Sequence, residues 1–156
     1  MNRFTQPAII GFYGYSRSGK TSLITHIIDR LSKKGIAIGV VKITDKPISS
    51  EPEGKDTHVF RQFGAVLTTF SSAAETSFAL NQALDIQDIL QIIGSNVKVD
   101  LVIIEGAHSD LIPKIRVGDI PLRHNTLLTF SGNIDEIEAT INSLLTEKGK
   151  ANEDRN

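Results

Sequence analysis

The chain has 156 residues, of which 40% are hydrophobic and 22% charged, and its formal net charge is −1. This length and composition are typical of one globular domain with a sizeable core, and the near-neutral charge argues against a nucleic-acid partner. The absence of cysteine excludes disulfides, thiolate metal sites and a cysteine nucleophile.

The first half of the chain alternates apolar runs with amphipathic ones. Residues 8–13 are apolar throughout, as in a buried parallel strand. The helix that begins at Lys20 places its apolar side chains on one face: Leu23, Ile24, Ile27, Ile28 and Leu31. Further strands are expected at 36–41, 65–70 and 77–80, with a loop over 44–55. A short helix from Asp56 is expected to turn three apolar side chains inward: Val59, Phe60 and Phe63.

The second half repeats the alternation. A helix from Ile86 is expected to end at Gly94, and a last helix covers 133–147. Short strands are expected at 101–104, 114–117 and 127–130. The polar residues 148–156 predict a disordered tail after a single domain over 1–147.

The order of these elements predicts an α/β fold with a mostly parallel central sheet covered by helices on both faces, in three layers. In such sheets, ligands bind beyond the carboxyl ends of the strands. The candidate site segments are therefore those that follow strands: 14–21, 42–46, 71–73, 105–110 and 131–133.

The segment after the first strand, GYSRSGKT, fits the P-loop pattern G-x-x-x-x-G-K-[ST]. Its glycines let successive backbone N–H groups face a phosphate at the start of a helix. Lys20 supplies a charge for the outer phosphates, and Thr21 offers a hydroxyl to Mg²⁺. Arg17, at a variable position, is expected to point to solvent. The candidate nucleotide-binding residues are Gly14, Tyr15, Ser16, Arg17, Ser18, Gly19, Lys20, Thr21 and Ser22.

Three charged residues elsewhere are candidates for the same site. Glu105 ends an apolar strand, which is the Walker B layout for a carboxylate near Mg²⁺. Asp56 is either the N-cap of its helix or a metal ligand, and position alone does not separate the two. Lys42 is either a surface lysine or a catalytic residue that reaches the outer phosphates, as Lys20 does, or a second substrate. His108 lies in the loop after Glu105 but, like the other histidines, shows no metal-ligand spacing.

The chain resembles the molybdopterin-guanine dinucleotide biosynthesis protein B (MobB) family from about Ile9 to Ile141. Besides the P-loop, the resemblance rests on four short motifs: Gly54-Lys55-Asp56, Phe63-Gly64-Ala65, Glu105-Gly106 and Pro113-Lys114-Ile115. It implies a P-loop NTPase fold, GTP as ligand or substrate, weak hydrolysis and often a homodimer. It also implies that Thr21, Asp56 and Glu105 share Mg²⁺.

The same resemblance implies a role in joining GMP to molybdopterin, with the molybdenum cofactor guanylyltransferase as partner and molybdopterin as a candidate ligand. No apolar run is long enough for a signal peptide or a membrane span, so we expect a cytoplasmic protein without a membrane partner. A P-loop small-molecule kinase or dethiobiotin-synthetase-like ligase is the enzymatic alternative, and a nucleotide-dependent structural module is a third. The chain departs from the family at Ile43 and at Ala107-His108, positions expected at the rim of the site.

Overall fold

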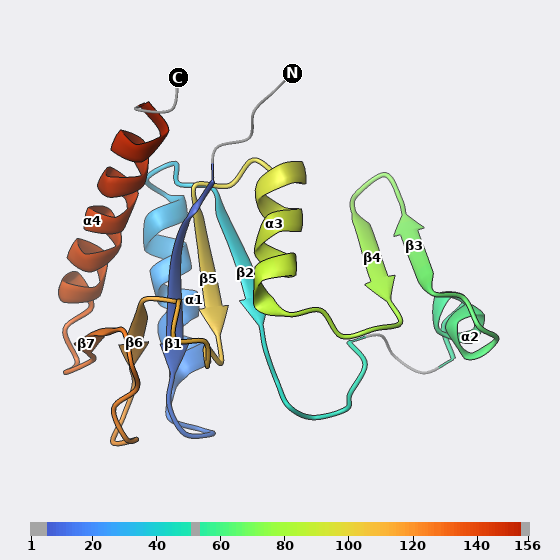
Figure 1. Cartoon of the computed structure of the whole chain (residues 1–156), viewed down its shortest axis with the longest axis horizontal. Helices are drawn as coiled ribbons and strands as arrows, with labels where there is room; N and C mark the ends of the chain where they lie inside the picture. Colours follow the sequence, from blue (N-terminus) through green and yellow to red (C-terminus); the bar gives the residue numbers. More distant parts are fainter. Residues whose placement is uncertain (1–5, 51–53, 154–156) are drawn as a thin grey trace. The chain divides into compact units, whose positions relative to one another are not determined.

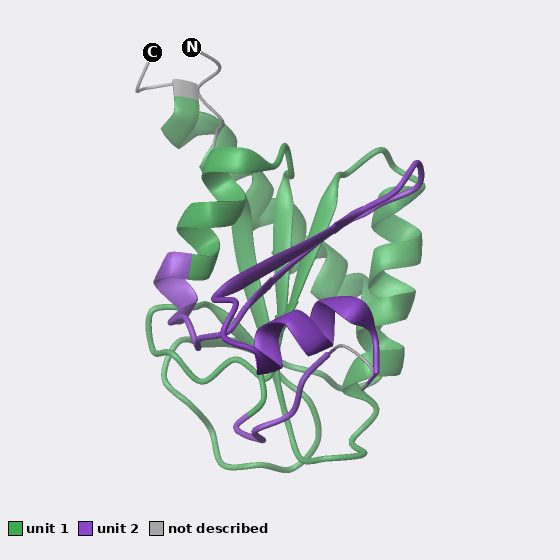
Figure 2. Cartoon of the chain, turned by 90° about the vertical axis from the view of Figure 1, so that its right-hand side faces the viewer, with its two compact units in different colours: residues 1–44, 89–156 green, residues 45–88 purple. Residues whose placement is uncertain are grey.

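The computed structural model describes residues 6–50 and 54–153 and forms two compact units. The first unit comprises residues 1–44 and 89–156, and the second comprises residues 45–88 (Figure 2). Within the described residues, no helix combines the length and the apolar character needed to cross a membrane.

The first unit is built on a five-stranded parallel sheet (Figure 1). Its strand order is β2-β5-β1-β6-β7. The strands are β1 (Ala8–Tyr13), β2 (Ile38–Lys42), β5 (Leu101–Glu105), β6 (Lys114–Arg116) and β7 (Thr126–Thr129). Glu105 is in register with Phe12 of β1 on one side and with Lys42 of β2 on the other, so β1, β5 and β2 end at the same edge of the sheet. The predicted α/β fold with a mostly parallel sheet is confirmed.

Helices cover both faces of this sheet. Figure 2 shows the strands lying between α1 (Lys20–Ser32) and α3 (Ile86–Asn96), whose first residues belong to the second unit. α1 and α4 (Ile134–Glu153) share one core with the sheet. The predicted apolar stripe of α1 forms part of this core, since Leu23, Ile24, Ile27 and Leu31 are all buried. Because α1 starts directly after the P-loop, its burial fixes the position of that loop.

The second unit holds α2 (Asp56–Gln62) and an antiparallel hairpin of β3 (Leu67–Ser71) and β4 (Thr76–Leu80). The hairpin is a separate two-stranded sheet, so the expectation that 71–73 lie at the ligand edge of the main sheet is wrong. Ser71 instead leads into the hairpin turn, where the Ser72 hydroxyl accepts hydrogen bonds from the amides of Ala74 and Glu75.

The inward orientation expected for the apolar residues of α2 is also wrong. Val59, Phe60 and Phe63 are 37%, 58% and 87% exposed. A seven-residue helix in so short a unit has little apolar surface to pack on, and none of its residues is buried.

Helix ends differ from the expected ones because glycine and polar residues do not by themselves stop a helix. α3 passes through Gly94, where a side chain would meet Pro7 at 3.7 Å, and ends at Asn96. α4 continues beyond residue 147 to Glu153, into the segment expected to be a tail. Residues 154–156 of that segment lie outside the described residues.

Candidate functional site

The P-loop connects β1 to α1 in a tight turn. Arg17 and Gly19 both have positive φ angles, 63° and 85°, and the Ser18 amide donates to the Tyr15 carbonyl at 3.2 Å. Gly14 lies against the end of β6: a Cβ on it would be 2.3 Å from the Val117 carbonyl oxygen. The loop is therefore pressed against the strand next to β1, which explains why its first position needs glycine.

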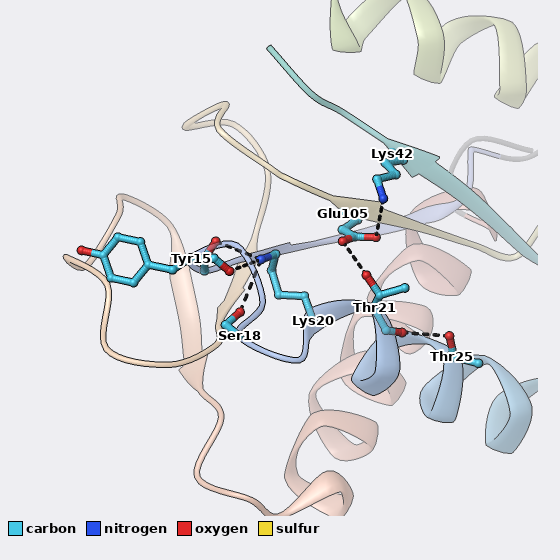
Figure 3. A network of polar contacts seen from close by, with 8 residues as sticks. Tyr15, Ser18, Lys20, Thr21, Thr25, Lys42 and Glu105 are labelled. Atoms are coloured by element: carbon cyan, nitrogen blue, oxygen red, sulfur yellow. Dashed lines mark hydrogen bonds and ion pairs between the residues drawn. The ribbon is translucent and has the colours of Figure 1, made fainter. Parts of the chain in front are cut away.

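The Lys20 ammonium lies inside this loop (Figure 3). It donates hydrogen bonds to the Gly14 carbonyl at 3.0 Å, the Tyr15 carbonyl at 2.6 Å and the Ser18 hydroxyl at 3.3 Å. The Tyr15 side chain points away from the lysine and is 58% exposed. Lys20 thus brings a positive charge to the concave side of the loop, where a phosphate would bind.

Thr21 and Glu105 are brought together although they lie far apart in the sequence. The Thr21 hydroxyl donates to Glu105 Oε1 at 2.9 Å, and Lys42 Nζ lies 4.0 Å from the other carboxylate oxygen (Figure 3). The Lys42 side chain is 69% exposed, whereas that of Glu105 is 15% exposed. A hydroxyl and a carboxylate at the carboxyl edge are hard oxygen donors of the kind that Mg²⁺ prefers, so these residues fit the ion.

Asp56 belongs to the second unit and is the first residue of α2. The N-cap residue of α2 is Lys55, so the interpretation of Asp56 as the cap is wrong by one position. Asp56 remains an acid in the first turn of a short helix. Within the described residues, no group of three or more His, Asp or Glu side chains is arranged to hold a metal ion.

The other P-loop candidates differ in exposure. Ser16, Arg17 and Ser22 are exposed, which agrees with the solvent-facing orientation expected for Arg17.

In the turn after β5, His108 is also exposed, but Ala107 is fully buried and does not lie at the rim as expected. The reason is Gly106, whose φ of 86° turns the chain back over β1.

A buried polar cluster next to the turn after Glu105 was not anticipated from the sequence. Lys114 is fully buried, and its ammonium donates to the carbonyls of Ile112 and His124, both at 2.9 Å. Burial lowers the pKa of Lys114 below its ordinary value of 10.5; the Arg123 charge adds to this effect, while Asp110 and Tyr13 oppose it. The feature of the sequence that could have indicated this cluster is Lys114 itself, a charged residue between Pro113 and Ile115 in an expected strand.

Comparisons with known proteins point to one family. Residues 9–141 match the family model described as "Molybdopterin guanine dinucleotide synthesis protein B", MobB. The chain is 36% identical over 69% of its length to a "Putative molybdopterin-guanine dinucleotide biosynthesis adapter protein" of Methanocaldococcus jannaschii. It is 30% identical over 71% of its length to the "Molybdopterin-guanine dinucleotide biosynthesis adapter protein" of Escherichia coli. These alignments span 45% and 65% of the two relatives, so the chain matches about half to two thirds of their length.

The fold is shared with solved structures. The crystal structure of Bacillus subtilis MobB superposes with a TM-score of 0.66 at 18% identity, over 85% of this chain and 96% of that one. A second structure, titled molybdopterin-guanine biosynthesis protein B, gives a TM-score of 0.59 at 24% identity, over 88% of this chain and 99% of that one. At these identities the likeness concerns the fold.

Proposed function

The chain belongs to the MobB family, and from this premise we propose that it is a GTP-binding, slowly GTP-hydrolysing adapter in molybdopterin guanine dinucleotide synthesis. Its partner in this proposal is the molybdenum cofactor guanylyltransferase, and it acts in the cytoplasm as a homodimer. The observation that carries the proposal is the 2.9 Å hydrogen bond between Thr21 and Glu105. It joins a P-loop to a Walker B carboxylate at the edge where parallel sheets bind ligands.

Phosphate binding follows from the loop and the helix together. The backbone N–H groups of the P-loop and the N-terminal end of α1 favour negative charge. Lys20 already donates to three oxygens of the loop, and in our proposal its ammonium turns to the outer phosphates of the nucleotide. The burial of Leu23 and Ile24 in the first turns of α1 keeps this arrangement rigid.

Thr21 and Glu105 are the residues that would hold Mg²⁺, with Asp56 proposed as a further ligand from the family resemblance. When bound, the ion supplies positive charge that neutralises part of the nucleotide's phosphate charge. The role of the chain is to orient its oxygen donors: the Thr21 hydroxyl is fixed by its bond to Glu105. Lys42, 4.0 Å from the same carboxylate, adds electrostatic stabilisation at this edge.

Slow hydrolysis is expected because fast phosphoryl transfer needs additional positive charge on the transferred group and a residue that positions water. His108 is the nearest candidate for the second task, and its side chain is exposed. An arginine supplied by a partner increases such rates by about a thousandfold or more. We therefore propose that the guanylyltransferase or a second copy of the chain completes the site.

The decisive experiment compares GTP with ATP, each with and without Mg²⁺, by fluorescence titration of the full chain. We expect tighter binding of GTP and a further gain from Mg²⁺ that Thr21→Val abolishes. Thr25→Val is the matched control, because Thr25 lies one turn further along α1 and its hydroxyl donates to the Thr21 carbonyl at 2.8 Å. A preference for ATP would contradict the GTP assignment. Several turnovers per second by dilute protein alone would contradict the adapter role.

A further inference from the structure

A buried polar cluster occupies the face of the sheet opposite to α1 and α4, over β1, β6 and β7. Ile10 and Phe12 belong to the core shared with α1 and α4, so Tyr13, the next residue of β1, points to the opposite face. Tyr13 is 1% exposed and Lys114 is fully buried. Polar side chains in such a place need partners, and here two loops supply them.

The two loops are joined by Lys114. Its ammonium donates to the Ile112 carbonyl, in the loop after β5, and to the His124 carbonyl, in the loop before β7. Both distances are 2.9 Å. The buried amine therefore holds the ends of these two loops together.

Arg123 makes the second connection between the same loops. Its Nη1 donates to the Ala107 carbonyl at 2.9 Å, and its guanidinium carbon lies 4.8 Å from the centre of the Tyr13 ring. Its own backbone is fixed as well: the amide donates to Tyr13 Oη at 3.1 Å, and the carbonyl accepts from the Thr126 hydroxyl at 2.6 Å. An arginine held at both ends is a rigid support.

The Ala107 carbonyl, which accepts the hydrogen bond from Arg123, belongs to the turn that follows Glu105. The amides of Gly106 and Ala107 both donate to the Phe12 carbonyl, at 3.0 and 3.3 Å. A Cβ on Gly106 would be 2.5 Å from the Ile43 carbonyl oxygen, so the turn is confined on that side too. Arg123 fixes the turn from the remaining direction, through the carbonyl of the fully buried Ala107.

We propose that Arg123 is a positioning residue: by holding the Ala107 carbonyl beside Tyr13, it fixes the turn at 105–107 and so the orientation of the Glu105 carboxylate toward a nucleotide-bound Mg²⁺. This inference rests on the proposed nucleotide function. Residues that orient a metal ligand without contacting the metal typically contribute about 10- to 100-fold to metal affinity. Arg123 acts through the turn and not on the nucleotide, so its loss should weaken the Mg²⁺ effect and leave metal-free binding nearly unchanged.

The test is a Mg²⁺ titration of the full chain with a fluorescent GTP analogue. We call the Mg²⁺ concentration that produces half of the maximal gain in affinity for the GTP analogue the half-effect concentration. For Arg123→Ala we expect this concentration to rise about tenfold. The affinity for the GTP analogue without metal should change by less than about twofold. Arg123→Lys should recover part of the loss, because an ammonium can still donate to the carbonyl. Arg30→Ala is the control: it breaks ion pairs to Asp135 and Glu138 between α1 and α4, both at 2.7 Å, away from the turn. It should lower the melting temperature without moving the half-effect concentration.

Hydrogen exchange provides a second readout that needs no bound metal. The amides of residues 106 and 107 should exchange faster in Arg123→Ala than in the wild type. An unchanged half-effect concentration in folded Arg123→Ala, or an equal shift in Arg30→Ala, would overturn the positioning role. If Arg123→Ala does not fold, Tyr13→Phe replaces it. This variant keeps the ring and removes the hydroxyl that accepts a hydrogen bond from the Arg123 amide and bonds to the Thr126 hydroxyl at 2.8 Å. That variant should shift the half-effect concentration in the same direction by a smaller factor, and no shift would count against the inference.

The two proposals fail in different ways. A wild type whose GTP binding does not respond to Mg²⁺ would contradict the proposed function. In that case the exchange measurement still decides whether Arg123 holds the turn: unchanged exchange at residues 106 and 107 refutes it.

Discussion

Replacing Gly14 by alanine tests the closest contact that the P-loop makes with the rest of the sheet. The new Cβ would lie 2.3 Å from the Val117 carbonyl oxygen and 2.9 Å from the Ser18 hydroxyl. Because optimal separations between non-bonded heavy atoms are about 3.5 Å or more, the loop must move by about 1 Å. Val117 cannot easily give way: it is buried, and its amide donates to the Tyr13 carbonyl at 2.8 Å.

The expected cost is that of overpacking, about 1–3 kcal/mol. For a chain of this size, such a loss lowers the melting temperature by about 2–4 °C per kcal/mol. The displaced loop should also bind GTP at least about tenfold more weakly, which corresponds to about 1.4 kcal/mol. Circular dichroism during heating and a fluorescence titration measure the two effects.

Gly19 provides the matched control for Gly14. A Cβ on Gly19 would have nothing within 4 Å, but the φ of this residue is 85°. Alanine there should cost about 1–2 kcal/mol from backbone strain alone, and asparagine should cost less because it tolerates left-handed backbone. At Gly14 the order should reverse, with asparagine worse than alanine. A Gly14→Ala variant with unchanged stability and GTP affinity would refute the packing of the P-loop against β6.

Three further predictions concern single side chains. Lys20→Ala should keep its circular dichroism spectrum and lose GTP affinity by about tenfold or more, the value of a charged hydrogen bond; unchanged affinity would remove Lys20 from the site. Asp56→Asn should reduce the Mg²⁺ effect on GTP binding with little change in melting temperature, since Lys55 is the N-cap of α2; the opposite result would make Asp56 purely structural. Lys114→Met tests whether burial lowers the pKa of Lys114. If the pKa is lower in the folded chain, the unfolded chain binds more protons than the folded chain at pH values between the folded pKa and 10.5. The unfolding free energy of the wild type minus that of Lys114→Met should therefore rise with pH in this window, as measured by urea unfolding, and a constant difference would contradict the lowered pKa.

The central sheet and the P-loop could be predicted from the sequence because their signals are local. Apolar runs such as that of β5 mark strands buried on both faces, and the stripe of α1 marks a helix buried on one. Glu105 could be identified because it directly follows such a run. Its contact with Thr21 then follows from a general property of parallel sheets, whose strands present their carboxyl ends at one edge.

The hairpin could not be assigned in the same way. β3 and β4 are short runs whose composition suits any sheet, and only their pairing, Leu67 with Leu80 and Ser71 with Thr76, makes them a separate unit. The exposure of Phe60 and Phe63 could not be predicted from the sequence either. A helical pattern shows which residues share a face, but it does not show whether anything covers that face.

The polar cluster was missed because its partners are backbone carbonyls, which carry no sequence signal. Lys114 is bound by Ile112 and His124, and Arg123 by Ala107, through atoms that every residue possesses. Sequence reasoning could therefore identify Lys114 as an unusual residue in a strand, but not the two loops that satisfy it.

Ala107 was expected at the rim of the site but lies in the core, where it is fully buried. A Cβ on Gly11 would lie 2.4 Å from the Ala107 Cβ and 3.2 Å from Ile112, so the methyl group of Ala107 occupies the space that Gly11 leaves free on β1. A larger residue at 107 would crowd this space beside β1. The side chain at 107 is therefore part of the core in this chain and is not available to a nucleotide or a partner. The exposed His108 is the residue of this pair that can take such a contact.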